Sequence, residues 1–209
     1  MKNIIAFITL CLLISCKEKE AARKLPYYDT ADFTPKWALP KDSAFHSIRN
    51  FTLIDQEGAT FTEKDIAGKI CVADFFFTIC PGICPKMTNS MVELQKDFMN
   101  DNDVLLISHS VTPENDSVPV LKKYAETKGV QYPKWRLLTG KKEEIYDLGR
   151  KSYFVEEDLG LKKDSDDFLH TENFVLIDKN RHIRGIYNGL DPNSMAVLSK
   201  DIAALRKEN

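Results

Sequence analysis

Residues 70–85 read ICVADFFFTICPGICP, and this stretch joins a nearly continuous apolar run to two closely spaced cysteines. The apolar run over residues 70–77 predicts a strand that is buried on both faces of a sheet. Pro85 is typical of a first helical turn, so a helix is expected to begin at or just after Cys84. The cysteine pair is therefore predicted to lie where a central strand gives way to a helix.

The predicted position of Cys80 and Cys84 favours thiolate chemistry. Unpaired N–H groups and the helix dipole at a helix N-terminus stabilise a thiolate, so the pKa of Cys84 is expected to be lowered. Gly82 allows the short loop to turn back, so that both sulfurs can approach one point. Such a pair can form a disulfide, attack one or bind a soft metal. Three residues rather than two separate the cysteines, which suits chelation as well as redox cycling, and an imidazole is a natural third ligand for copper.

The rest of the chain alternates predicted strands with predicted helices. Strands are expected at 51–55, 59–61, 104–108, 135–138, 174–177 and 182–187, and helices at 85–99, from 118 to Gly129, after Gly140 and from Asp191 onward. Met87 and Met91 fall at helical spacing and are interpreted as core residues rather than copper ligands. The pattern predicts an α/β fold with a mixed central sheet flanked by helices and an N-terminal β-hairpin.

The N-terminus has the features of a bacterial lipoprotein signal. An apolar run at residues 4–14 follows Lys2 and ends in a Leu-Ile-Ser-Cys tetrad that resembles a lipobox, with Cys16 as the lipidated residue. We therefore expect a signal peptide at 1–16, a tether and extended segment at 17–47, and one folded domain at 48–209. The domain is expected to be lipid-anchored to a membrane of a bacterial cell envelope and to face the periplasm or the exterior.

Composition excludes one class of partner and narrows the use of the cysteines. The 209 residues carry a formal net charge of −2, so no basic field favours nucleic acid. Removal of Cys11 with the signal and lipidation of Cys16 leave three cysteines. Cys80 and Cys84 then form the working pair in an oxidising compartment, and Cys71 is interpreted as a buried small hydrophobe.

The sequence has four histidines, and the residues alone select none of them as a ligand. His46 and His182 are expected to be surface or packing residues. His109 directly follows a predicted central strand and is a minor candidate for the site. His170 stands between a polar, acidic segment at 156–167 and the predicted strand at 174–177, where a lone histidine is more often structural.

Three segments together resemble the SCO1/SenC family of copper-binding, thioredoxin-like proteins. They are FFTxCPxxCP at 76–85, WxLxTG at 135–140, and HT at 170–171 ahead of FxLID at 174–178. The resemblance runs from about residue 51 to 204 and implies a thioredoxin-like fold. It also implies that Cys80, Cys84 and His170 bind one copper ion, as Cu(I) or Cu(II). The implied function is delivery of copper to the dinuclear copper site of cytochrome c oxidase, or reduction of that site's cysteines. The implied partner is the subunit that carries the site, or another extracytoplasmic copper or thiol client.

The chain departs from the family pattern at two positions. Thr112 stands where the family commonly has the Asp of Val-Asp-Pro, and Leu169 stands where an acidic residue commonly precedes the histidine. Loss of a carboxylate beside a ligating histidine leaves the imidazole less oriented, so the departures are expected to affect copper affinity more than fold.

Two kinds of activity therefore stay open, a metallochaperone and a thiol–disulfide oxidoreductase that works without metal. In the second, Cys80 attacks and Cys84 resolves. A peroxiredoxin fits less well, because Thr78 stands two rather than three residues before Cys80. A structural zinc site also fits poorly, because the spacing offers no fourth ligand.

Overall fold

The computed structural model describes residues 23–40, 45–155 and 171–208 and has one seven-stranded sheet at its centre. The strands are β1 (Thr52–Asp55), β2 (Thr60–Thr62), β3 (Ile70–Phe76), β4 (Val104–Ser110), β5 (Trp135–Thr139), β6 (Asn173–Ile177) and β7 (Ile183–Asn188). The helices are α1 (Glu63–Ile66), α2 (Cys84–Phe98), α3 (Val118–Lys128), α4 (Lys142–Asp147), the π-helical turn η1 (Leu148–Ser152) and α5 (Pro192–Leu205). The predicted α/β fold with a mixed sheet and an N-terminal hairpin is confirmed.

The sheet mixes parallel and antiparallel pairs in the order β2-β1-β5-β4-β3-β6-β7. Strands β3, β4 and β5 are parallel, whereas β6 runs antiparallel to β3, β7 to β6, and β1 to both β5 and β2. All seven residues of β3 are buried, as its apolar run predicted. Because Phe76 pairs with Ser110 at the last rung of the β3–β4 ladder, the loops that follow these two strands emerge side by side.

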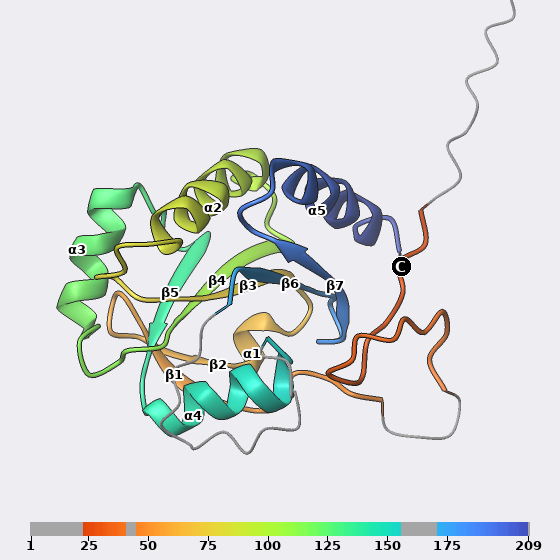
Figure 1. The fold of residues 1–209 in the computed structure, drawn as a ribbon, viewed down its shortest axis with the longest axis horizontal. Helices are drawn as coiled ribbons and strands as arrows, with labels where there is room; N and C mark the ends of the chain where they lie inside the picture. The colour runs from red at the N-terminus through yellow and green to blue at the C-terminus, as the bar shows by residue number, and fades with distance from the viewer. Residues whose placement is uncertain (1–22, 41–44, 156–170, 209) are drawn as a thin grey trace, which may run out of the picture.

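Helices cover both faces of the sheet, which gives three layers (Figure 1). One core lies under α2, α3 and α5 and contains Cys80 and Cys84, with Met87 and Met91 fully buried as interpreted from the sequence. The other core lies under α1, α4 and η1 and contains Cys71, which is also fully buried. Alternate residues of β3 enter the two cores. Cys80 and Cys84 lie in the first core, so the pair is on one face of the sheet and Cys71 is on the other.

The helix ends follow local sequence signals. Pro85 is in the first turn of α2, and Gly129 ends α3 in the left-handed conformation, with φ of 75°. The Asp191 side chain caps α5 by accepting hydrogen bonds from the backbone N–H groups of Asn193 and Ser194 at 3.0 and 3.3 Å. These are the residue types that favour helix starts and ends, so α2, α3 and α5 lie close to their predicted positions.

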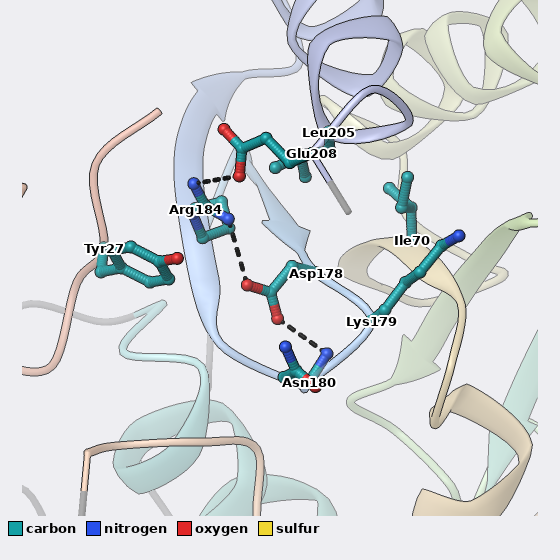
Figure 2. A pocket seen from close by; sticks show the side chains of 8 residues that line it. All are labelled: Tyr27, Ile70, Asp178, Lys179, Asn180, Arg184, Leu205 and Glu208. Carbon is teal, nitrogen blue, oxygen red and sulfur yellow. Dashed lines mark hydrogen bonds and ion pairs between the residues drawn. The ribbon is translucent and has the colours of Figure 1, made fainter. Parts of the chain in front are cut away.

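The N-terminal segment is held to the outer edge of the sheet by Arg184 of β7. Its guanidinium donates hydrogen bonds to the carbonyl oxygens of Leu25 and Pro26, forms ion pairs with Asp178 and Glu208, and lies 3.9 Å from the ring centroid of Tyr27. Figure 2 shows these side chains around a small cavity of about 110 Å³. The segment therefore packs against β7 and the C-terminal end of α5, as its position beside the C-terminus in Figure 1 also shows.

His109 lies on the face of the sheet opposite the cysteine pair, which corrects the prediction of a strand that ends before it. Strand β4 continues to Ser110, so His109 is part of the strand rather than of a loop. Its ring is fully buried, stacks on Phe75 at a centroid distance of 4.9 Å and contacts the Tyr153 hydroxyl at 3.2 Å through Nε2. His109 therefore belongs to the second core and is not a ligand candidate for the dithiol.

Burial of His109 predicts a loss of stability in acid. Burial lowers the pKa of this imidazole from 6.5 to about 3, so the folded protein disfavours a proton that the unfolded chain accepts. The contribution is complete above pH 6.5, and the free energy of unfolding is expected to fall as pH drops toward 3, by up to about 1.4 kcal/mol per pH unit. Denaturant unfolding at several pH values checks this, with His109→Gln as the comparison. An equally steep pH dependence in that variant would assign the loss to other groups.

Candidate functional site

The two cysteines lie together at the junction of β3 and α2. Cys84 is the first residue of α2 and is 4% exposed, whereas Cys80 lies in the preceding loop and is 9% exposed. Both are free thiols, and the Cys84 thiol donates a hydrogen bond to the Cys80 sulfur. Ile79, which directly precedes Cys80, is 69% exposed. The loop tip therefore faces solvent, while both sulfurs lie just beneath the surface.

The surroundings of the two thiols shift their pKa values in opposite directions. At Cys80, burial raises the pKa, but hydrogen bonds from Cys84 and from the backbone N–H groups of residues 82–84 outweigh it, and the net pKa is lowered. At Cys84, burial raises the pKa, and donation to Cys80 and the nearby charges of Cys80 and Asp74 raise it further. Cys80 is therefore the more acidic thiol of the pair. The raised pKa of Cys84 corrects the prediction of a lowered pKa at the helix start, because burial outweighs the effect of the helix N-terminus there.

Alkylation should show the same asymmetry. Iodoacetamide attacks thiolates, so it is expected to modify Cys80 before Cys84, with a reaction midpoint below the ordinary thiol pKa of about 8.5. Peptide mapping by mass spectrometry across a range of pH values measures both quantities. Preferential labelling of Cys84, or a midpoint above the ordinary value, would contradict the assignment.

A buried carboxyl group lies on the inner side of the pair, on the same face of β3. Asp74 is 2% exposed, and burial raises its pKa to about 7, although a hydrogen bond with Ser108 opposes the rise. Its Oδ1 atom has no hydrogen-bond partner among the residues that the structure describes. Tyr124 closes this region by hydrogen bonding to Thr88, whose hydroxyl also donates to the Cys84 carbonyl at 2.8 Å. The floor of the site is therefore polar but inaccessible to bulk solvent.

Sequence reasoning did not single out Asp74 or Asp116, two buried carboxylates near the dithiol. Asp74 carried a signal, because a lone charged residue inside an apolar strand must be buried with it. Asp116 carried no such signal, since its loop is mostly polar. Only the tertiary structure brings its Oδ1 atom to 2.5 Å from the Thr78 Oγ1 atom.

The predicted third ligand, His170, lies outside the described residues, as do Leu169, the segment at 156–167 and Cys16. The described chain resumes at Thr171, and hydrogen bonds show where residues 171–172 run relative to α2. Gly189 donates to the Glu172 carbonyl at 2.8 Å and accepts from the Ser90 hydroxyl of α2 at 2.7 Å. The chain that leaves His170 therefore runs beside the N-terminal half of α2, at the same end of the sheet as the dithiol.

The other histidines take packing roles. His46 donates a hydrogen bond from Nε2–H to the Ser152 carbonyl oxygen at 2.7 Å, and its ring lies 4.4 Å from the Phe154 ring centroid. His182 packs between Tyr27 and Phe45. Within residues 23–40, 45–155 and 171–208, no cluster of three or more His, Cys, Asp or Glu side chains is arranged as a metal site. In the same ranges, no helix is both long and apolar enough to cross a bilayer.

The fold and the site define a class of protein, namely a thioredoxin-like domain with a Cys-x₃-Cys dithiol at the N-terminus of its first long helix. The SCO1/SenC family model matches residues 40–206. A SCO1 protein homolog from Bacillus subtilis (strain 168) is 35% identical over 155 residues, which are 72% of this chain and 78% of the homolog. The chain belongs to the SCO1/SenC family.

Solved structures support the same assignment. The crystal structure of a SCO1/SenC family lipoprotein from Bacillus anthracis str. Ames superposes with a TM-score of 0.68 at 29% identity and covers 81% of this chain and 100% of its own. BsSco, a member of the Sco family of cytochrome c oxidase assembly proteins with a disulfide switch, gives a TM-score of 0.65 at 32% identity over 80% of this chain and 98% of its own. The crystal structure of Arabidopsis thaliana ScoI with copper bound gives a TM-score of 0.59 at 27% identity over 76% of this chain and 98% of its own. These matches confirm the predicted family and the thioredoxin-like fold.

Proposed function

We propose that this chain is an envelope protein in which Cys80, Cys84 and His170 hold one copper ion. It delivers this copper to the dinuclear copper site of cytochrome c oxidase, or its thiols reduce the cysteines of that site. The observation that carries the proposal is the pair of free thiols in contact at the start of α2. Two adjacent sulfurs are the soft donors that Cu(I) prefers, and an imidazole completes a set that also accepts Cu(II).

The path of the chain after His170 supports it as the third donor. Strand β6 begins at Asn173 and pairs antiparallel with β3, with Val175 opposite Ala73. Residues that precede β6 therefore lie toward the end of β3 from which the dithiol loop emerges. Only Thr171 and Glu172 separate His170 from this strand in sequence, which supports His170 as the third donor.

The relatives support copper as cargo and the oxidase as client. A copper-bound ScoI and a protein of the cytochrome c oxidase assembly family share this fold at 27% and 32% identity. The anchor rests on the lipobox-like tetrad that ends at Cys16 and on a structural relative described as a lipoprotein. The proposed domain is lipid-anchored to a membrane of a bacterial cell envelope, faces the periplasm or the exterior, and is tethered by residues 17–47.

A second function, thiol–disulfide exchange without metal, is favoured by the opposite pKa shifts of the two thiols. The Cys80 thiolate is suited to attack a client disulfide, which forms a mixed disulfide and releases one client thiolate. Cys84 then loses its proton and attacks Cys80, which closes the Cys80–Cys84 disulfide and releases the second client thiol. This activity requires no histidine.

Anaerobic titration of the reduced protein with Cu(I) and with Cu(II) separates the two functions. The copper proposal predicts one equivalent bound and, for Cu(II), intense thiolate-to-copper charge-transfer absorption. Absence of stoichiometric binding, together with retained reduction of a model disulfide, would leave thiol–disulfide exchange as the function.

A further inference from the structure

A buried carboxylate connects the loop that carries Cys80 to the end of the neighbouring strand. Asp116 is fully buried in the loop between β4 and α3. Its Oδ1 atom accepts from the Thr78 hydroxyl at 2.5 Å, and its Oδ2 atom accepts from the Ser110 hydroxyl at 2.5 Å and the Thr112 hydroxyl at 3.2 Å. Oδ2 also accepts from the Thr78 backbone N–H at 3.3 Å. One carboxylate thus accepts from three hydroxyl groups, which come from the Cys80 loop, from the end of β4 and from the loop that follows β4.

These contacts have the character of charge-assisted hydrogen bonds. The two 2.5 Å contacts fall in the range typical of O–H···O⁻ bonds, which are about twice as strong as neutral ones. No Lys, Arg or His among the residues described lies within ion-pair distance of Asp116. A buried carboxylate without a cationic partner depends on its hydroxyl donors, so Asp116 and the three hydroxyls act as one unit, which we call the hydroxyl clamp (Thr78, Ser110, Thr112, Asp116).

The two halves of the clamp are fixed to different degrees. The half at Ser110 and Thr112 is built into the sheet, because Ser110 is the last residue of β4 and the Val111 N–H donates to the Phe76 carbonyl at 2.9 Å. The half at Thr78 begins the loop that runs to α2. Between Thr78 and Cys84 this loop has one backbone hydrogen bond to its own start, a long one of 3.4 Å from the Cys80 N–H to the Phe77 carbonyl. Asp116 therefore joins the start of the loop to the end of β4 through side-chain hydrogen bonds.

We infer that Asp116 is a positioning residue for the dithiol, which holds the Cys80 loop through Thr78 and thereby sets the balance between the dithiol and the Cys80–Cys84 disulfide. A disulfide requires an S–S bond near 2.05 Å and a restricted range of Cα separation, whereas two thiols need only contact. The clamp holds the loop in the geometry of the free thiols seen here. Releasing Thr78 frees the loop to meet the disulfide geometry, so the disulfide becomes more favourable.

This inference rests on the redox part of the proposed function and does not depend on copper. The equilibrium concerned is that of the dithiol with a small-molecule disulfide. Oxidised glutathione gains two electrons and two protons to give two glutathione thiols, and Cys80 and Cys84 lose them to form one S–S bond. Thr112 supplies one of the three hydroxyls that donate to Asp116, at 3.2 Å.

The test compares variants at the two ends of the clamp in a glutathione redox buffer without copper. Thr78→Val removes the hydroxyl of the dithiol loop, and Thr112→Val removes a hydroxyl from the same carboxylate on the sheet side. Thr78→Ser keeps the donor. The fraction of disulfide at equilibrium, measured by acid quench and mass spectrometry, gives the equilibrium constant of each variant. Unfolding by denaturant of the reduced and the oxidised forms gives the stability of each state.

Thr78→Val is expected to shift the equilibrium toward the disulfide at least about fivefold relative to Thr112→Val, with Thr78→Ser close to the wild type. The reduced form should lose more stability than the oxidised form, since only the reduced form depends on the held loop. A smaller shift, a shift toward the dithiol, or equal loss of stability in both forms would overturn the inference and leave Asp116 a purely structural residue. If the wild type itself forms no disulfide in this buffer, the redox part of the proposed function fails with it. If the wild type forms the disulfide but the equilibrium of Thr78→Val does not shift, only the positioning role is contradicted.

Discussion

Replacing Cys84 with serine is expected to abolish both disulfide formation and stoichiometric copper binding. The variant loses one of two soft donors and the thiol that donates to Cys80. Loss of a residue that merely orients a ligand costs about 10–100-fold in metal affinity, so loss of a ligand should exceed about 100-fold. Competition titration with a Cu(I) chelator measures the affinity, and mass spectrometry after oxidation reports the disulfide.

Cys71→Ala is the matched control, because it removes one thiol from the opposite core. Cys71 is fully buried, and burial raises its pKa far above the ordinary thiol range, so it contributes no thiolate. This control should bind copper and form the disulfide like the wild type. Wild-type copper affinity in Cys84→Ser would show that the dithiol is not the copper site.

Replacing His170 with alanine is expected to separate the two activities of the site. Copper affinity should fall by at least about 10–100-fold, because two thiolates lose their third donor. The Cys80–Cys84 disulfide equilibrium should not change, because the pKa asymmetry of the pair arises from burial, from hydrogen bonds within residues 77–84 and from the charge of Asp74. The two quantities are measured on one preparation, by chelator competition and by glutathione titration.

His46→Gln serves as the control for removing a histidine, since the half-buried His46 packs on Phe154 and donates to the Ser152 carbonyl, away from the cysteines. Its copper affinity should equal that of the wild type. Unchanged affinity in His170→Ala would remove the histidine from the ligand set, and a parallel loss of disulfide formation would indicate that it supports the loop rather than the metal.

The main features of the fold were predictable because they depend on local signals. The apolar run of β3, Pro85 in the first turn of α2, Gly129 after α3 and Asp191 before α5 each indicate one element with one physical cause. The sheet order was not predictable, because the pairing of β1 with β5 joins segments about 80 residues apart in sequence and depends on burial of both rather than on a turn.

The site was predictable only in part. The spacing of Cys80 and Cys84 beside a helix start indicates thiolate chemistry, but the difference between their pKa values depends on which N–H groups point at which sulfur. His109 was misjudged because β4 extends two residues beyond its predicted end, and each added residue alternates between the faces of the sheet. The hydroxyl clamp was not predictable from the sequence. Its members follow or end two different strands and meet only when β3 and β4 pair in parallel.

X-ray absorption at the copper edge, measured on the wild type and His170→Ala side by side, tests the convergence of three side chains on one ion most directly. Coordination by Cys80, Cys84 and His170 predicts two sulfur scatterers and one imidazole nitrogen around each copper in the wild type. In the variant, the imidazole signal should be lost and both sulfurs kept. Identical spectra from the two proteins, or a wild-type copper with no sulfur neighbour, would contradict it.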